Sequence, residues 1–205
     1  MFVEINPYNI DHRLIRQVVE ELKAGKVIIF PTDTVYALGC DLMNKKGLQE
    51  LAKMKGIKLN KVNFSIICSD LSNLSDYTRQ IDRPTFKLLK QYLPGPFTFI
   101  LPASNEVSKI FDTTKKEIGI RIPDNSIAIE LVKALGNPLA ATSLHNDDDK
   151  ILEYFADPYA IFQKYDDQVP YIIDGGNGHL EGSTIINCVE GEPFVVRQGL
   201  GKLNN

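Results

Sequence analysis

A cluster of polar side chains follows a short apolar run near the start of the chain. Residues 27–30 (VIIF) are apolar and mostly β-branched, as in a buried strand. Ligands of open α/β sheets bind at such strand ends, although Thr and Asp are also common in ordinary turns. We expect one turn that closes at Gly39 and forms either a binding loop or a plain connection. Its polar residues are Thr32, Asp33, Thr34 and Tyr36.

Basic side chains recur where an anion could bind. A group of lysines surrounds Gly56 and predicts either a solvated helix end or a cationic clamp for polyphosphate. Arg121 lies inside an apolar strand pattern (IGIRI), where its charge is costly unless it meets an anionic ligand or a carboxylate of the protein. Arg197 ends the last apolar run. The lysines are Lys53, Lys55, Lys58 and Lys61.

Two further expected strands carry hydroxyl groups at one end, at Thr142 and Ser143 and at Ser183 and Thr184. If these ends converge with the basic side chains, the site would suit a ligand with phosphate and carboxylate groups. The three histidines are scattered, and no G-x-S-x-G elbow is present. Catalysis would therefore depend on positioning and charge stabilisation more than on a covalent intermediate.

Helices and strands that could position these groups alternate along the chain. Helices are expected over residues 14–22, 48–54, 85–92, 126–135 and 151–165, the last broken at Asp157-Pro158. Asp11, Asn44 and either Asn125 or Ser126 are the expected N-caps, and Gly25 and Gly136 follow two C-termini. Strands are expected over residues 2–5, 27–30, 64–68, 97–101, 118–122, 138–141, 171–174, 183–188 and 193–197, with a loop over 71–77.

This order predicts an α/β fold with parallel and antiparallel strand pairs curved around a groove. The 205 residues suit a single domain over residues 1–205. A net charge of −3 argues against nucleic-acid binding by bulk charge, but a local basic face stays possible.

Three scattered cysteines without metal-ligand spacing are typical of reduced core thiols in a cytoplasmic protein. We expect neither a signal peptide nor a membrane span. The acidic run 147–149 is expected to cap a helix.

Seven motifs, taken in order, resemble the YrdC/TsaC/YciO family over roughly residues 10–200. The resemblance implies a YrdC-like twisted open mixed sheet with flanking helices around a concave basic cavity. The motifs are FPTDTVYALGC (30–40), KMKGIK (53–58), LPGPFTFIL (93–101), IGIRIPDN (118–125), PLAATS (138–143), GSTIINC (182–188) and VVRQG (195–199).

The best-understood members of this family are threonylcarbamoyl-AMP synthases. They convert L-threonine, bicarbonate and ATP into threonylcarbamoyl-adenylate and pyrophosphate, for the t6A modification of tRNA through transfer proteins. The resemblance implies Mg²⁺ on the phosphates, held mostly by substrate and water. It also implies catalytic roles for Lys55 and Lys58 on the triphosphate and for Arg121 on a carboxylate or phosphate. Thr32, Thr34 and Tyr36 would hold threonine, and Thr142, Ser143, Ser183 and Arg197 would contact the adenylate.

Two departures place the chain nearer the YciO-like branch. Synthases carry K-x-R where Lys55 is followed by Gly56, Ile57 and Lys58, and a lysine cannot form the bidentate contact of an arginine. Synthases also carry TSAN-x-SG where this chain has TSLHND, so that the asparagine expected to contact the nucleotide is either replaced by His145 or displaced to Asn146. Other members of the family have been described as binding double-stranded RNA or tRNA, so the resemblance also implies RNA binding in the same cavity. The alternatives are an RNA-binding protein of the YciO-like branch without synthase activity, and a hydrolase of threonylcarbamoylated tRNA.

Overall fold

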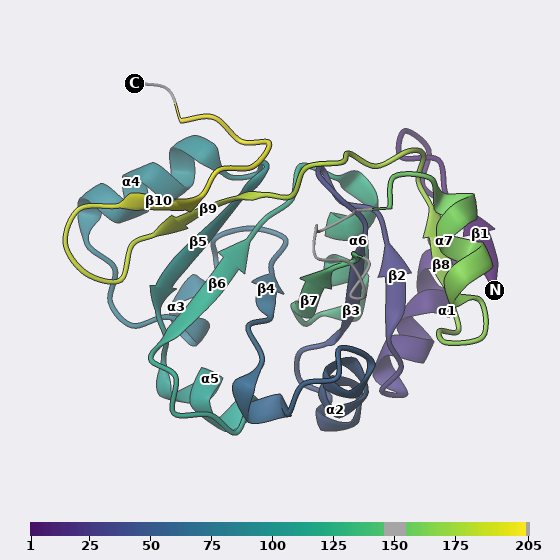
Figure 1. Cartoon of the computed structure of the whole chain (residues 1–205), viewed down its shortest axis with the longest axis horizontal. Coiled ribbons are helices and arrows are strands. Elements are labelled where there is room, and N and C mark those ends of the chain that lie inside the picture. The colour runs from purple at the N-terminus through teal and green to yellow at the C-terminus, as the bar shows by residue number, and fades with distance from the viewer. Residues whose placement is uncertain (146–154, 204–205) are drawn as a thin grey trace.

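The computed structural model describes residues 1–145 and 155–203, and within them ten strands form one twisted open sheet (Figure 1). The strand order is β1-β8-β2-β3-β7-β4-β6-β5-β9-β10, and parallel pairs mix with antiparallel ones, as predicted. The strands are β1 (Phe2–Glu4), β2 (Ile28–Phe30), β3 (Ala37–Asp41), β4 (Ser65–Ile67), β5 (Phe97–Pro102), β6 (Glu117–Arg121), β7 (Leu139–Ser143), β8 (Ile172–Asp174), β9 (Thr184–Asn187) and β10 (Phe194–Arg197).

Helices enclose the sheet by covering two hydrophobic cores. Ile28 and Phe30 of β2 belong to the core that contains α1 and α6, whereas Ile29 belongs to the core that contains α2 and α4. This split follows from the two-residue period of a strand, which sends alternate side chains to opposite faces. The helices are α1 (His12–Lys23), α2 (Lys45–Met54), α3 (Leu74–Tyr77), α4 (Arg83–Tyr92), α5 (Asn105–Ile110), α6 (Ser126–Leu135) and α7 (Pro158–Tyr165), with a 3-10 turn η1 (Leu59–Lys61).

The predicted helix ends are confirmed. Asp11 accepts hydrogen bonds from the first turn of α1, and Asn44 does the same for α2. Asn125, rather than Ser126, caps α6 by accepting from the N–H of Ala128. Gly136 ends α6 with a φ of +78°, a conformation that favours glycine because it has no Cβ.

The predicted turn from Thr32 to Gly39 is too long. Residues from Ala37 onward already form β3, which returns antiparallel to β2 and pairs Gly39 with Ile28. Gly39 serves packing instead of a turn, because a Cβ there would lie 2.7 Å from Cε1 of Phe30. Residues 37–40 (ALGC) are mostly small and have low strand propensity, so the sequence does not predict this strand.

The remaining predictions for the helices have mixed outcomes. The short helix α3 lies in the predicted loop over 71–77, and α5 was not expected at all. The expected break before Pro158 is confirmed, because α7 begins there. The acidic run 147–149 and the helix over 151–154 lie outside the described residues. Within the described residues, no helix is both long enough and apolar enough to cross a bilayer.

Candidate ligand-binding site

One face of the sheet is hollow where neighbouring strands carry small side chains. Ala37 pairs with Ser143, and Ser65 of β4 pairs with Ala141 on one side and Gly119 on the other. Cross-strand neighbours share a face, so small residues at opposed positions leave space above the backbone. The space is a cavity of about 180 Å³, here named the polar cavity. It is lined by Ala37, Asn63, Ser65, Ile67, Thr98, Arg121, Ala141, Thr142, Ser143, His145, Ser183, Ile185 and Arg197.

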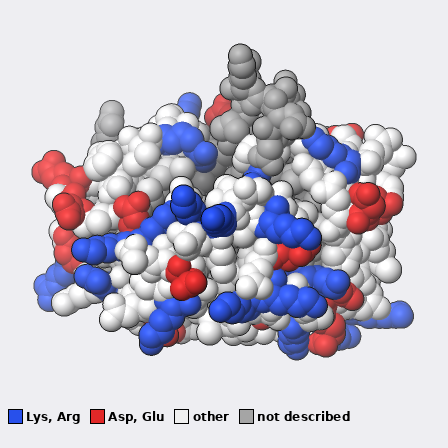
Figure 2. Space-filling model, turned by 60° about the horizontal axis from the view of Figure 1, so that its bottom comes forward, with Lys and Arg blue, Asp and Glu red and all other residues white. Residues whose placement is uncertain are grey.

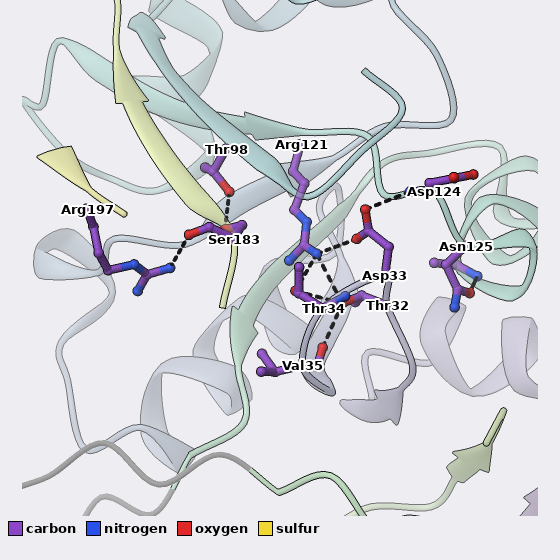
Figure 3. Close-up of polar contacts among 11 residues, drawn as sticks. Thr32, Asp33, Thr34, Val35, Thr98, Arg121, Asp124, Asn125, Ser183 and Arg197 are labelled. Atoms are coloured by element: carbon purple, nitrogen blue, oxygen red, sulfur yellow. Dashed lines mark hydrogen bonds and ion pairs between the residues drawn. The ribbon is translucent and has the colours of Figure 1, made fainter. Parts of the chain in front are cut away.

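Arg121, at the end of β6, reaches from this cavity to the loop after β2 (Figure 3). Its Nη2 donates to Oδ1 of Asp33 at 2.6 Å, to Oγ1 of Thr34 at 2.6 Å and to Oγ1 of Thr32 at 3.1 Å. The residue is only 6% exposed. Burial lowers the pKa of its guanidinium, and the Asp33 carboxylate partly opposes that shift.

Not every hydrogen-bond donor of the Arg121 guanidinium has a partner among the described residues. Its buried Nε has no hydrogen-bond partner among the described residues. The sequence left open whether Arg121 meets a ligand or forms an ion pair. The ion pair with Asp33 exists, and Arg121 also lines the polar cavity, so the structure contains the ion pair and leaves the ligand contact as a prediction.

Asp33 belongs to the predicted polar turn but was given no role in the predicted site. Its Oδ1 accepts from Arg121, and its Oδ2 accepts from the backbone N–H of Asp124 at 3.0 Å. One carboxylate therefore holds both the arginine and the turn that leads into α6 (Figure 3). The signal was present, because a buried arginine calls for a carboxylate and Asp33 stands between two candidate threonines.

A second arginine lies on the other side of Ser183 (Figure 3). Nη2 of Arg197 donates to the backbone oxygen of Ser183 at 2.8 Å, and the hydroxyl oxygens of Ser183 and Thr98 are 2.8 Å apart. Both arginines line the polar cavity, and none of the described residues in its lining is Asp or Glu. Because Asp33 pairs with Arg121, the cationic charge of this lining comes mainly from Arg197, and such a charge attracts anions.

The structure gathers half of the predicted site residues around this cavity: Arg121, Thr142, Ser143, Ser183 and Arg197. His145 joins them, with its Nδ1 3.2 Å from the backbone oxygen of Ser143. The hydroxyls of Thr32 and Thr34 accept hydrogen bonds from Arg121, but neither residue lines the cavity. In this structure they hold Arg121 in place, and their contact with threonine stays a prediction.

Tyr36 lies away from the polar cavity. The residue is completely buried, and its hydroxyl donates to the oxygen of Gly176 at 2.7 Å and accepts from the N–H of Gly175 at 3.2 Å. Burial raises the pKa of this phenol above its ordinary value. In this structure backbone groups bind the hydroxyl, and the contact between Tyr36 and threonine stays a prediction.

Lys55 and Lys58 also stand apart from the cavity lining. Lys55 is the half-buried C-cap of α2, and Lys58 is exposed just before η1. Figure 2 shows Lys and Arg gathered on the face formed by the bottom of Figure 1, where α2 lies. The exposed lysines of residues 45–61, here named the lysine segment, are Lys45, Lys46, Lys53, Lys58 and Lys61.

A second cavity of about 260 Å³ continues from the first, since the two share Asn63, Ser65, Thr98 and Ile185. We name it the apolar cavity. Sequence reasoning missed it because its walls come from segments far apart in the chain. Its other lining residues are Val62, Phe64, Ile100, Val107, Phe111, Thr113, Lys115, Glu117, Ile118, Gly119 and Val196.

The polar cavity does not fit a metal ion held by the protein. Mg²⁺ prefers carboxylate, phosphate and water oxygens, and the described lining offers hydroxyls and cations instead. The described residues also contain no group of three or more His, Cys, Asp or Glu side chains that could hold a metal. A magnesium ion here would therefore rely on oxygens of the substrate and of water.

Comparisons of the sequence and of the structure with known proteins find relatives of the same family. The Sua5/YciO/YrdC family model, described as "Telomere recombination", matches residues 20–199. Protein YciO of Escherichia coli, itself uncharacterized, is 38% identical over 98% of this chain and 96% of its own length. The crystal structure of E. coli YciO matches with a TM-score of 0.87 and covers 98% of this chain and 97% of that chain.

Synthases are more distant relatives. A threonylcarbamoyl-AMP synthase of Mus musculus is 30% identical over 90% of this chain, which spans 66% of the mouse protein. The crystal structure of Pyrococcus abyssi Sua5 complexed with L-threonine is 25% identical, with a TM-score of 0.87. That match covers 97% of this chain and 57% of the Sua5 chain.

Proposed function

The chain belongs to the Sua5/YciO/YrdC family, and we propose that it is a threonylcarbamoyl-AMP synthase-like enzyme. L-threonine and bicarbonate would form a carbamate with loss of water. A carbamate oxygen would then attack the α-phosphorus of ATP, so that pyrophosphate leaves and threonylcarbamoyl-adenylate remains. Relatives named as synthases and the threonine complex of P. abyssi Sua5 support this choice of substrates.

The observation that carries the proposal is a pair of arginines in a cavity whose described lining lacks carboxylates. Every reactant of this reaction carries a carboxylate, carbonate or phosphate group. Fixed cations stabilise the charge that develops on phosphoryl oxygens, and they act strongly where water is excluded. Arg121 and Arg197 would supply this charge, and the hydroxyls of Thr142, Ser143 and Ser183 would orient the anions.

The predicted residues that do not line the polar cavity would position other residues or contact the outer phosphates. Thr32 and Thr34 would position Arg121, and Tyr36 would support the adjoining turn. Lys55 and Lys58 would meet the outer phosphates, because the segment that carries them leads to Asn63 at the cavity lining. The product would serve tRNA t6A modification in the cytoplasm through transfer proteins.

The test is substrate-dependent release of pyrophosphate. Purified protein would be incubated with ATP, Mg²⁺, bicarbonate and L-threonine, and both pyrophosphate and the adenylate would be measured. Omission of threonine should abolish release. Arg197→Ala should lower kcat/KM by more than ~tenfold, since hydrogen bonds to charged groups contribute about 1.5–3 kcal/mol. Arg79→Ala removes an exposed charge elsewhere and should leave the rate unchanged. Absence of pyrophosphate with all substrates present would overturn the proposal.

RNA binding is the second candidate function, and the lysine segment favours it (Figure 2). Contacts between lysines and phosphates release counterions, so affinity should fall steeply with salt. Lys53, Lys58 and Lys61 changed together to Gln should weaken tRNA binding and flatten its salt dependence. The matched control changes Lys87, Lys90 and Lys133, which are exposed on α4 and α6. Equal losses in both triple variants would show a bulk-charge effect and exclude a dedicated RNA surface.

A further inference from the structure

A groove away from the polar cavity lies at the end of the sheet that carries the N-terminus. It is formed by β1, the loop after β1, the start of α7 and the turn after β8, which lie together at the right of Figure 1. Its volume is about 750 Å³, and it shares no described lining residue with the polar cavity. We name it the aromatic groove. Its aromatic and acidic lining residues are Phe2, Glu4, Tyr8, Asp157, Tyr159 and Asp174.

The aromatic side chains of this groove are open to solvent. Tyr8 is 98% exposed, and Tyr159 is 56% exposed. The ring of Tyr159 meets the half-buried Phe2 edge to face, with centroids 6.4 Å apart and planes at 77°. Exposed apolar surface of this kind marks interaction sites, because a partner that covers it removes apolar area from water. The groove therefore offers rings that a partner can cover.

The charged side chains of the groove are all of one sign. Its described lining holds the carboxylates of Glu4, Asp157 and Asp174 and no Lys or Arg. Oδ1 of Asp157 accepts from the N–H of Tyr159 at 2.9 Å, and Oδ1 of Asp174 accepts from the N–H of Gly176 at 2.9 Å. Within the described residues, no hydrogen bond uses Oδ2 of either aspartate. These oxygens attract a cation and repel a phosphate.

The turn and the loop that border the groove are fixed by hydrogen bonds. The Tyr36 hydroxyl bonds to the oxygen of Gly176 and to the N–H of Gly175. The Ser126 hydroxyl donates to the backbone oxygen of Pro7 at 2.7 Å. Because both walls are already ordered, a partner can bind without a large loss of backbone freedom in this protein.

The chemistry of the partner follows from these rings and carboxylates. Among the described residues, no three His, Cys, Asp or Glu side chains are placed to hold a metal ion, so the carboxylates suit a larger cation. A planar guanidinium stacks on an aromatic ring and pairs bidentately with a carboxylate, whereas a lysine ammonium is a point charge. Small-molecule sites bury most of their ligand, which the almost fully exposed Tyr8 cannot do. An extended peptide can cover the rings and the carboxylates together.

We propose that the aromatic groove binds an extended, arginine-containing segment of a partner protein. Guanidinium groups of the segment stack on Tyr8 and Tyr159 and pair with the carboxylates of Glu4, Asp157 and Asp174. This surface goes beyond the proposed function, because it lies outside the polar cavity and takes a protein as its partner.

The test uses a fluorescein-labelled synthetic peptide of alternating arginine and glycine, with binding measured by fluorescence anisotropy. A peptide with citrulline at every arginine position is the control, because citrulline keeps the shape of arginine and removes its charge. The wild type should bind the arginine peptide at least ~tenfold more tightly than the citrulline peptide, and added salt should weaken that binding. The assay contains neither ATP nor threonine, so its outcome does not depend on the proposed function.

A triple variant of the groove removes its charge and keeps its hydrogen-bond acceptors. It combines Glu4→Gln, Asp157→Asn and Asp174→Asn, and the amide oxygens of the two asparagines can still accept from the N–H groups of Tyr159 and Gly176. The variant should bind the arginine peptide more than ~tenfold more weakly than the wild type, since several surface ion pairs are lost together.

The matched control combines Glu192→Gln, Asp76→Asn and Asp82→Asn, which remove the same charge from exposed residues outside the groove. It should leave the affinity for the arginine peptide nearly unchanged. Tyr8→Ala should weaken this affinity by about threefold, the usual size of an exposed cation–π contact. Phe86→Ala removes an exposed ring on α4 and should leave the affinity unchanged.

Three results would overturn the inference: no binding of the arginine peptide by the wild type, equal affinities for the arginine and citrulline peptides, or equal losses in the two triple variants. The last result would assign the binding to the net charge of −3 and not to the groove.

Discussion

The carboxylate of Asp33 and the guanidinium of Arg121 form a buried ion pair that joins the loop after β2 to the end of β6. Oδ1 and Nη2 are 2.6 Å apart, and the two side chains are 8% and 7% exposed. Removing one partner of such a pair leaves a buried charge without compensation, which typically costs about 3–5 kcal/mol. The pair therefore couples the stability of the fold to the geometry of the candidate site.

Asp33→Ala should lower the free energy of unfolding by roughly 3–5 kcal/mol, because Arg121 would stay buried and charged. Urea unfolding followed by circular dichroism measures this loss. Arg121→Met in the same background removes the orphaned charge, so the double variant should lose less than the sum of the two single variants. Additive losses would show that the two side chains do not interact.

Tyr36→Phe should lower the free energy of unfolding by about 1–3 kcal/mol, since it leaves the N–H of Gly175 and the oxygen of Gly176 without a partner. Its affinity for ATP should stay unchanged, because the hydroxyl does not reach the polar cavity. Urea unfolding and calorimetric titration measure the two quantities. Weaker ATP binding at unchanged stability would instead place the hydroxyl on the ligand.

Alkaline pH should destabilise the protein through its buried thiols. Burial, with a smaller effect of Asp70, raises the pKa of Cys68 to about 12, whereas an unfolded cysteine titrates near ~8.5. Between these values the unfolded state binds fewer protons than the folded state. The free energy of unfolding therefore falls as pH rises, by up to ~1.4 kcal/mol per pH unit for this thiol.

Urea unfolding at pH 9 and pH 10 measures that slope. Cys68→Ala removes one titrating group and should have a shallower slope than the wild type over this interval. Cys40 and Cys188 remain in both proteins, and burial raises the pKa of each, so their contributions cancel in the comparison. Identical slopes would mean that the Cys68 thiol titrates alike in both states.

Gly39→Ala should destabilise the β2–β3 pair. The new methyl group would lie 2.7 Å from Cε1 of Phe30 and 3.2 Å from the backbone oxygen of Ala140. Overpacking of this kind costs about 1–3 kcal/mol, measurable by urea unfolding. Phe30→Leu removes the clashing ring atom, so Gly39→Ala should cost less in that background. An equal cost in both backgrounds would assign the effect to the glycine backbone.

Much of the fold could be predicted because its causes are local. Asp11 and Asn44 cap helices through side-chain oxygens that reach N–H groups two and three residues away. The apolar run before Thr32 is a strand, and the need of Arg121 for an anion follows from its strand position alone. Strand β3 was missed because its cause is not local. Small residues such as Gly39 have little strand propensity and form a strand only where a partner strand packs against them.

The site was predictable in its residue types but not in its geometry. The sequence by itself determined the family, the alternation of helices and strands, and the presence of hydroxyls and arginines at strand ends. Only the tertiary structure decided that Asp33 neutralises Arg121 across 88 residues of chain. It also decided that Tyr36 supports a turn and that Lys55 stands outside the cavity lining.

The physical reason is the range of the interactions. Capping and strand propensity act within a few residues, so the order of the amino acids reveals them directly. A cavity exists only where strands from distant segments pair in one register and small residues such as Ser65, Ala141 and Gly119 are set side by side. No local pattern specifies that register, and the polar and apolar cavities are therefore properties of the folded sheet.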